Sequence, residues 1–135
     1  MEEIELIAAD VVDAALMLHR RIGPGLLESV YEALLAAELI ARGRAVRRQQ
    51  PIDFTFNGMR FDAAFRVDLI VGEKLVVEIK SVERLNAVHA KQLLTYLRLM
   101  EQPLGLLINF GGETLREGLR RVVNNHNAFA PSRLI

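Results

Sequence analysis

The chain has 135 residues, of which 51% are hydrophobic and 25% charged, so it has the size and apolar content of a single globular domain spanning residues 1–135. It contains no cysteine, which excludes a disulfide framework and any thiolate metal site. Seventeen basic residues balance seventeen acidic ones, so no overall field draws the protein to nucleic acid or to an anionic membrane. Binding of either kind would need a local patch.

The first part of the chain has the pattern of two helices. From Glu3 to about Arg21, apolar residues recur at spacings of three and four, and Gly23-Pro24-Gly25 ends this segment. A second helix is expected from about Leu26 to Ala41, with Gly43 as its C-cap. Its expected inward residues are Leu27, Val30, Leu34, Leu35 and Leu39.

Strand signals follow. Ile52 to Phe56 alternates between apolar and polar residues, and Asn57-Gly58 is a strong two-residue hairpin signal leading into Met59 to Phe61. Two more strands are expected, from Phe65 to Val71 and from Leu75 to Ile79.

The last third of the chain alternates helix and strand. A helix is predicted from Ala87 to about Gln102, between Asn86 as its N-cap and Pro103 as its stop. Leu104 to Phe110 is a continuous apolar run suited to a strand buried on both faces, and a fourth helix is expected from about Glu113 to Asn124. The resulting order α-α-β-β-β-β-α-β-α predicts an α/β fold in which helices flank a mixed central sheet.

Two neighbouring predicted strands carry acidic residues. Alternation puts Arg66 and Asp68 on one face, with Phe65, Val67 and Leu69 on the other. Glu78 and Lys80 likewise share a face, opposite Leu75, Val77 and Ile79. A three-residue loop Gly72-Glu73-Lys74 would place Asp68 opposite Glu78 and Arg66 opposite Lys80. A two-residue turn would separate the two acids, so the register stays open.

Two like charges directly opposite each other destabilise a hairpin unless a cation compensates them. Two carboxylates, a backbone carbonyl and several waters suit Mg²⁺, and Lys80 would then meet an anionic substrate. The alternative is that Asp68, Glu78 and Lys80 belong only to the solvated face of an amphipathic hairpin.

Four elements in a fixed order resemble a known family. Asp68, then Glu78-Ile79-Lys80, then a helix bearing Gln92 and Tyr96 are similar to the PD-(D/E)xK nuclease superfamily, in the branch with a Gln-x-x-x-Tyr helix. Upstream, Gly25 to Tyr31 resembles the pattern of the GxxExxY family of the same superfamily. The resemblance covers most of the chain.

The resemblance implies a restriction-endonuclease-like core and hydrolysis of phosphodiester bonds in DNA with Mg²⁺ or Mn²⁺. The implied metal ligands are Asp68, Glu78, the Ile79 carbonyl and Glu28, the last directly or through water. Lys80 would orient or help deprotonate the attacking water and stabilise charge on phosphorus. The residues implied in catalysis are Glu28, Asp68, Glu78, Lys80, Gln92 and Tyr96.

Several of these residues have simpler interpretations. Glu28 also fits a capping role at the start of the second helix, and Tyr31 fits a core position with a satisfied hydroxyl. On the third helix, His89, Gln92 and Tyr96 form one stripe by spacing, which would also suit a wet helix edge.

Basic residues Arg42, Arg44, Arg47 and Arg48 cluster between the second helix and the first strand, and with His89 they are the expected nucleic-acid contacts. Arg116, Arg120 and Arg121 form a second basic cluster on the predicted last helix. DNA is favoured over RNA as the partner, and a role in DNA repair or defence is expected.

No apolar stretch approaches the ~20 residues of a membrane span, so a cytoplasmic protein without membrane contact is expected. A homodimer or a larger DNA-processing complex stays open. The alternative function is that of a catalytically silent nuclease-fold subunit that binds nucleic acid or assists a partner.

Overall fold

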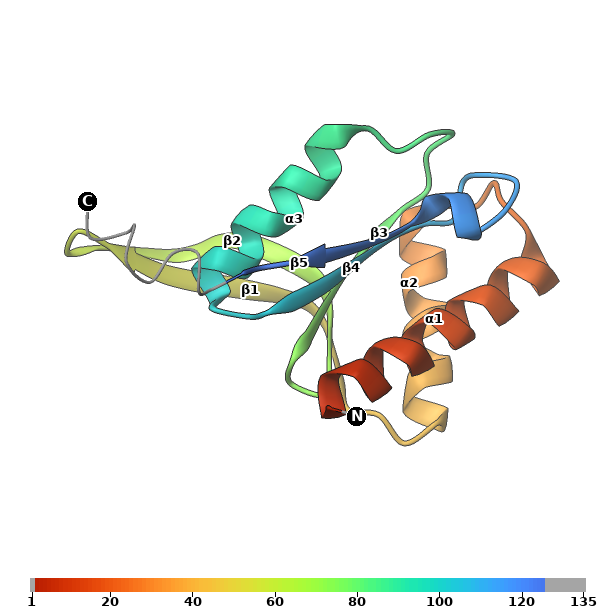
Figure 1. Ribbon diagram of the computed structural model, residues 1–135, viewed down its shortest axis with the longest axis horizontal. Helices are drawn as coiled ribbons and strands as arrows, with labels where there is room; N and C mark the ends of the chain where they lie inside the picture. Colours follow the sequence, from red (N-terminus) through yellow and green to blue (C-terminus); the bar gives the residue numbers. More distant parts are fainter. Residues whose placement is uncertain (1, 126–135) are drawn as a thin grey trace.

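The computed structural model describes residues 2–125, which form a five-stranded sheet with helices on both faces (Figure 1). The strands lie in the order β1-β2-β3-β4-β5, and the β3–β4 pair is parallel whereas the other pairs are antiparallel. The predicted mixed sheet flanked by helices is thus confirmed. The elements are α1 (Glu3–Ile22), α2 (Glu28–Ala41), β1 (Val46–Phe56), β2 (Met59–Val71), β3 (Leu75–Lys80), α3 (Ala87–Met100), β4 (Leu104–Asn109), the 3₁₀ turn η1 (Arg116–Gly118) and β5 (Leu119–Val123).

Each face of the sheet has its own apolar core. On one face α1 and α2 pack over β3 and β4, and on the other α3 places Leu93 and Leu97 over Val76 and Leu107. Every residue of β4 is buried, as expected for a strand covered on both faces. None of the helices formed by residues 2–125 has the length and apolarity of a membrane span.

Helix α2 uses a different face from the expected one. Tyr31, Leu35 and Leu39 point into the core, whereas Leu27, Val30 and Leu34 are exposed, Leu27 by 73%. The prediction that these three residues face inward is wrong because α2 is apolar almost all round, so spacing alone cannot select its buried stripe.

The strands β1 and β2 form one long hairpin. Asn57 and Gly58 both have positive φ, +50° and +76°, as the predicted two-residue turn requires. The two strands expected at 59–61 and 65–71 are one continuous strand, β2. Ala63 (φ +49°) lies near a register shift between β1 and β2, so β2 is irregular between the two segments that were predicted as separate strands.

The predicted helix at 113–124 is wrong, because this segment forms η1 and then β5. β5 pairs antiparallel with β4 from Leu104↔Val123 to Ile108↔Leu119. Leu119 packs into the core under α1 and Val122 into the core under α3, which is the alternation of a strand. Pairing with the edge of β4 supplies hydrogen-bond partners that local sequence spacing does not reveal.

The loop after β3 is fixed to the end of β4 by Asn109. The Asn109 side chain accepts a hydrogen bond from the Val82 N–H at 2.9 Å and donates one to the Val82 carbonyl at 2.8 Å. Gly111 lies so close to Val82 that a Cβ at position 111 would overlap the Val82 backbone. This contact holds the segment that directly follows Lys80.

We expect Gly111→Ala to lower the free energy of unfolding by about 1 to 3 kcal/mol, because the added methyl group must displace backbone atoms. Urea denaturation measures the change. Gly112→Ala is the matched control, since a Cβ there has its nearest neighbour at an ordinary 3.6 Å. Equal stabilities of the two variants would contradict this packing.

Candidate active site

The strands β2 and β3 pair beside their connecting loop and then diverge. The pairs are Val71↔Leu75, Ile70↔Val76 and Leu69↔Val77, so Gly72–Lys74 is the three-residue loop that the acidic register required. Beyond these pairs β2 continues along β1, and β3 continues along β4 as far as Lys80. We call the point of divergence, at Asp68 and Glu78, the strand fork.

At the strand fork, each acidic side chain binds the backbone of the opposite strand. The Asp68 N–H donates to Glu78 Oε2 and the Ile79 N–H donates to Asp68 Oδ2, both at 2.7 Å. The carboxylates thus replace the carbonyl partners that the N–H groups lose where the ladder ends. The expected pairing of Arg66 with Lys80 does not form, because the strands have already separated there.

The strand β2 also changes face at Asp68. Leu69 packs toward α1 and α2, whereas Phe65 and Val67 pack toward α3. The prediction that these three residues share a face is therefore wrong. Across the hairpin Gln49 has a φ of +47°, between the pairs Arg48↔Leu69 and Gln50↔Val67, so the hairpin is irregular at this step.

A hydrogen-bond network that centres on the buried Glu32 reaches the strand fork from α2. Glu32, only 5% exposed, accepts from Arg48 Nε at 3.1 Å and from Gln49 Nε2 at 2.5 Å. Gln49 Nε2 also donates to Asp68 Oδ1 at 3.2 Å. Sequence reasoning missed Glu32 and Gln49. The available signal was an acidic residue one helical turn after Glu28, beside the inward-facing Tyr31.

Glu28 lies at the end of β3. Its Oε2 accepts a hydrogen bond from the Ser81 N–H at 3.2 Å, directly after Lys80. The Ser81 hydroxyl donates in turn to the Leu26 carbonyl at 2.6 Å. The Glu28 carboxylate therefore contacts the backbone directly after β3, and its place in a metal site stays a prediction.

Tyr31 is a buried core residue with a satisfied hydroxyl. The hydroxyl donates to the Gly23 carbonyl at 2.6 Å and accepts from the Leu26 N–H at 3.2 Å. Its ring stacks on Phe110 with centroids 4.5 Å apart. Tyr31 thus holds the loop that leads into α2 and places Glu28 beside β3.

The two carboxyl groups of the strand fork have raised pKa values. Burial, together with the neighbouring Asp68 charge, raises the pKa of Glu78 to about 8. Burial likewise raises the pKa of Asp68, with a contribution from Glu32. Lys80 opposes both shifts and supplies a positive charge beside the two acids.

Helix α3 brings its predicted residues to the other side of β3. Burial raises the pKa of Tyr96, and so do the charges of Glu78 and Asp68, while its ring stacks on Phe65 at 4.2 Å. Gln92 is exposed one turn earlier. His89 belongs to the N-terminal cap of α3, where its Nδ1 accepts from the Asn86 N–H at 3.3 Å.

The first basic cluster is paired with acidic residues. Arg42 binds Asp10, Asp13 and Glu38, and Arg44 also binds Asp10, which lowers the pKa of Asp10. The remaining pairs are Arg47 with Glu73 and Arg48 with Glu32. The four arginines thus form no unneutralised patch, and their role in nucleic-acid binding stays a prediction.

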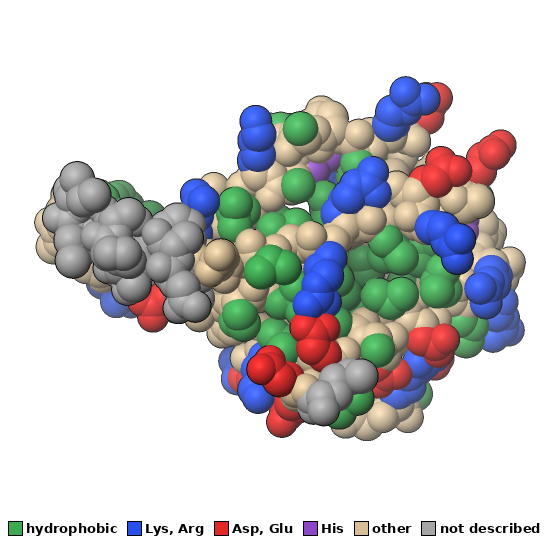
Figure 2. Space-filling model, viewed as in Figure 1, with side chains coloured by type: hydrophobic (Ala, Val, Ile, Leu, Met, Phe, Trp, Pro, Cys, Tyr) green, Lys and Arg blue, Asp and Glu red, His purple; other side chains and the backbone are tan. Residues whose placement is uncertain are grey.

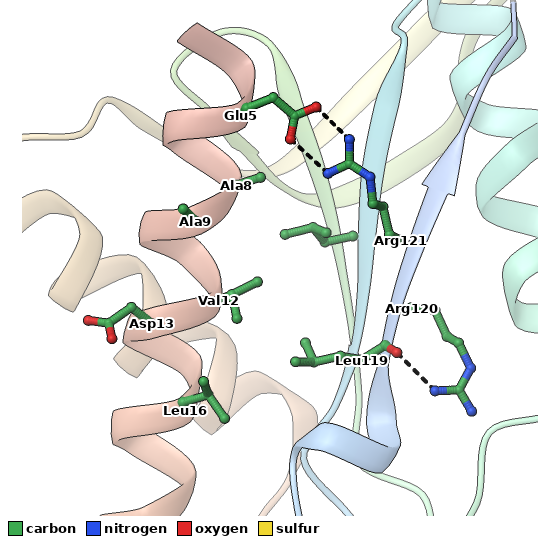
Figure 3. A pocket seen from close by; sticks show the side chains of 10 residues that line it. Glu5, Ala8, Ala9, Val12, Asp13, Leu16, Leu119, Arg120 and Arg121 are labelled. Atoms are coloured by element: carbon green, nitrogen blue, oxygen red, sulfur yellow. Dashed lines mark hydrogen bonds and ion pairs between the residues drawn. The ribbon is translucent and has the colours of Figure 1, made fainter. Parts of the chain in front are cut away.

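The second basic cluster is divided by the strand that replaces the expected helix. Arg121 forms an ion pair with Glu5 of α1, whereas Arg120 donates to the backbone carbonyl of Leu119 (Figure 3). Arg121 and Glu5 also border a groove of about 720 Å³ between α1 and β5. Its floor is apolar, and apolar side chains gather between α1 and the sheet on this face of the molecule (Figure 2).

A profile of the PD-(D/E)XK nuclease superfamily matches residues 5–122, which include the strand fork and both helices beside it. The chain belongs to the PD-(D/E)XK nuclease superfamily. Its sheet and flanking helices are accordingly the restriction-endonuclease-like fold that the sequence predicted. Comparison with curated protein sequences and with solved structures gave no match.

Nucleases of this superfamily generally use divalent metal ions, and the donors at the strand fork suit one. Among residues 2–125 no group of three or more His, Cys, Asp or Glu side chains is arranged to hold a metal. Mg²⁺ needs fewer, since it keeps several waters and binds through one or two carboxylates. The raised pKa values of Asp68 and Glu78 show that ionising these carboxyl groups is unfavourable without a compensating positive charge, which a cation would supply.

Backbone geometry adds an oxygen donor to this set. The Lys80 carbonyl accepts from the Phe110 N–H, so it points toward β4. Carbonyls of successive strand residues point to opposite edges, so the Ile79 carbonyl points toward β2, as its N–H does. It therefore lies on the same edge as the two acids.

The pKa of Glu78 makes the stability of the metal-free protein depend on pH. Because the folded-state pKa is raised from 4.5 to about 8, the stabilisation from protonated Glu78 is fully present below about pH 4.5 and is lost as the pH rises through about 8. Glu78→Gln removes this loss. In EDTA, we expect the variant to gain stability relative to the wild type between pH 5 and pH 9, measured by urea denaturation. A difference that is independent of pH, or that falls with pH, would contradict the assignment.

Proposed function

We propose that this protein is a Mg²⁺- or Mn²⁺-dependent nuclease that hydrolyses phosphodiester bonds in DNA. The observation that carries the proposal is the strand fork, where Asp68 and Glu78 meet with Lys80 alongside. Asp68, Glu78 and the Ile79 carbonyl would hold the cation. When bound, a divalent cation makes water a usable nucleophile at neutral pH and neutralises charge on a phosphate.

Lys80 is the proposed partner of the substrate phosphate. Alternation along β3 puts it on the same face as Glu78, the face that α3 covers. Its ammonium would stabilise the negative charge that develops on the phosphate oxygens and would orient the attacking water. Because Lys80 is the residue just before Ser81, the contacts of Ser81 with Glu28 and Leu26 hold its backbone in place.

The surrounding residues have supporting roles in this proposal. Glu28, at the end of β3, would hold the cation through water. Tyr96 and Gln92 would line the α3 side of the site, where they would contact the substrate phosphate or groups of the metal site. Burial and the charges of Glu78 and Asp68 raise the pKa of the Tyr96 hydroxyl. Of the predicted basic contacts, Arg48 is best supported, because it is half-exposed and is joined to the strand fork through Glu32.

We further propose that the chain belongs to the GxxExxY group of the superfamily. The pattern residues have clear tasks in this protein. Gly25 has a φ of +112°, which favours glycine, and Tyr31 holds the loop around it. Together they bring Glu28 to β3. DNA as the substrate and action in the cytoplasm, alone or within a larger DNA-processing complex, belong to the same proposal.

The direct test uses labelled single- and double-stranded DNA and RNA, incubated with Mg²⁺, Mn²⁺ or EDTA. We expect the wild type to cleave DNA only with a metal, and Asp68→Asn and Lys80→Ala each to lower the rate at least about 100-fold. The first removes a charge that would hold the cation, and the second removes the ammonium that would stabilise the reacting phosphate. Lys74→Ala, an exposed lysine in the loop at the other end of the hairpin, should cleave like the wild type.

Wild-type inactivity on every substrate with either metal would contradict the proposal, and so would cleavage unchanged by both substitutions. Binding of DNA without metal-dependent cleavage would instead support the silent subunit. Calorimetry separates the two functions, because the nuclease requires Mn²⁺ binding that Asp68→Asn weakens.

A further inference from the structure

We propose that Gln49 is a positioning residue, which orients the Asp68 carboxylate for its cation and is itself held by the buried Glu32, whose other partner is the half-exposed Arg48. This inference rests on the proposed function. Gln49 Nε2 donates to Glu32 Oε1 at 2.5 Å and to Asp68 Oδ1 at 3.2 Å. One amide group, with its two hydrogens, thus bridges two carboxylates.

The bridge completes the fixing of Asp68. Oδ1 accepts from Gln49, and Oδ2 accepts from the Ile79 N–H at 2.7 Å. With both oxygens held, the carboxylate plane cannot turn freely. Each oxygen still has a lone pair for a cation, because a carboxylate offers about four acceptor sites. The two hydrogen bonds therefore set the direction from which a metal is bound without occupying every acceptor site.

The other end of the bridge is equally constrained. Glu32 is 5% exposed, and its second oxygen accepts from Arg48 Nε at 3.1 Å. Since Glu32 lies on α2 and Gln49 on β1, the amide is held between a helix and the sheet. Leaving the buried Glu32 carboxylate without hydrogen-bond donors would cost free energy of folding. This cost favours the conformation in which Arg48 and Gln49 both donate to Glu32.

The backbone of Gln49 points to the same conclusion. Its φ of +47° lies in the left-handed region, which is unfavourable for a residue with a Cβ and persists only where the surrounding contacts demand it. The step from Arg48 to Gln50 is also where β2 changes face at Asp68. The strained residue and the proposed metal ligand therefore occupy the same irregular step of the hairpin.

A neutral amide suits this task better than a cationic side chain. A lysine or arginine at position 49 would orient Asp68 but would also neutralise it and compete with the metal for its charge. The amide donates a hydrogen bond and leaves the negative charge of Asp68 intact. It also places N–H donors between Glu32 and Asp68, two like charges that would otherwise face each other.

The test compares Gln49→Gly with Ala63→Gly. Glycine relieves the positive φ at both positions, +47° and +49°, but only the first substitution removes the bridge to Asp68. Gln49→Met is a second variant, which keeps the side-chain volume without a donor. Calorimetric titration with Mn²⁺ in the absence of DNA gives the metal affinity, and circular dichroism checks the fold.

We expect Gln49→Gly and Gln49→Met to bind Mn²⁺ about 10-fold more weakly than the wild type or worse, the usual loss when a residue that orients a metal ligand is removed. Cleavage should need correspondingly more Mn²⁺ for half-maximal rate, with an unchanged KM for DNA. Ala63→Gly should bind and cleave like the wild type.

Mn²⁺ affinities of both Gln49 variants within about twofold of the wild type would overturn the positioning role while leaving the proposed function intact. An equal loss in Ala63→Gly would overturn it too, because the effect would then come from the backbone of the hairpin. A wild type that binds no Mn²⁺ through Asp68 would overturn the proposed function and this inference together.

Discussion

The separation of β2 from β3 is the constraint on which the site depends. Where the ladder ends, the N–H groups of Asp68 and Ile79 lose their carbonyl partners, and the carboxylates of Glu78 and Asp68 replace them. Because both carboxylates complete the backbone hydrogen bonding of the sheet, their places are set by the sheet itself. They are also held close together in a partly buried position, where burial raises the pKa of each and the charge of Asp68 adds to the shift of Glu78. Under the proposed function, stability without metal and affinity for metal are therefore opposed at one pair of residues.

Elements distant in the sequence converge on the end of β3. Tyr31 secures the loop before α2, so that Glu28 reaches the Ser81 N–H, and Asn109 of β4 clamps Val82 from the other side. Lys80 precedes this doubly anchored segment. These contacts fix the backbone on both sides of the segment that follows Lys80. The network through Glu32 and Gln49 adds a third anchor, on the β2 side of the strand fork.

The sequence predicted the parts that depend on local chemistry. The hairpin turn at Asn57-Gly58 follows from its turn residues. The three-residue loop, which brings Asp68 to Glu78, is one of the two turn lengths that the sequence left open. The prediction from side-chain alternation was wrong at Asp68 because it assumes a regular strand. The positive φ of Gln49, in the same irregular step, cannot be predicted from its residue type. β5 was not predicted because its formation depends on pairing with β4. The ion pair of Arg42 with Asp10 was not predicted because the two residues lie 32 positions apart in the sequence.

The central claim is that the two acids of the strand fork share one divalent cation. Anomalous diffraction from crystals soaked in millimolar Mn²⁺ tests it without any assumption about substrate. The account predicts a manganese peak between the carboxylates of Asp68 and Glu78, with the Ile79 carbonyl as a further ligand. An empty strand fork under these conditions, with both carboxylates still bound only to backbone N–H groups, would contradict it.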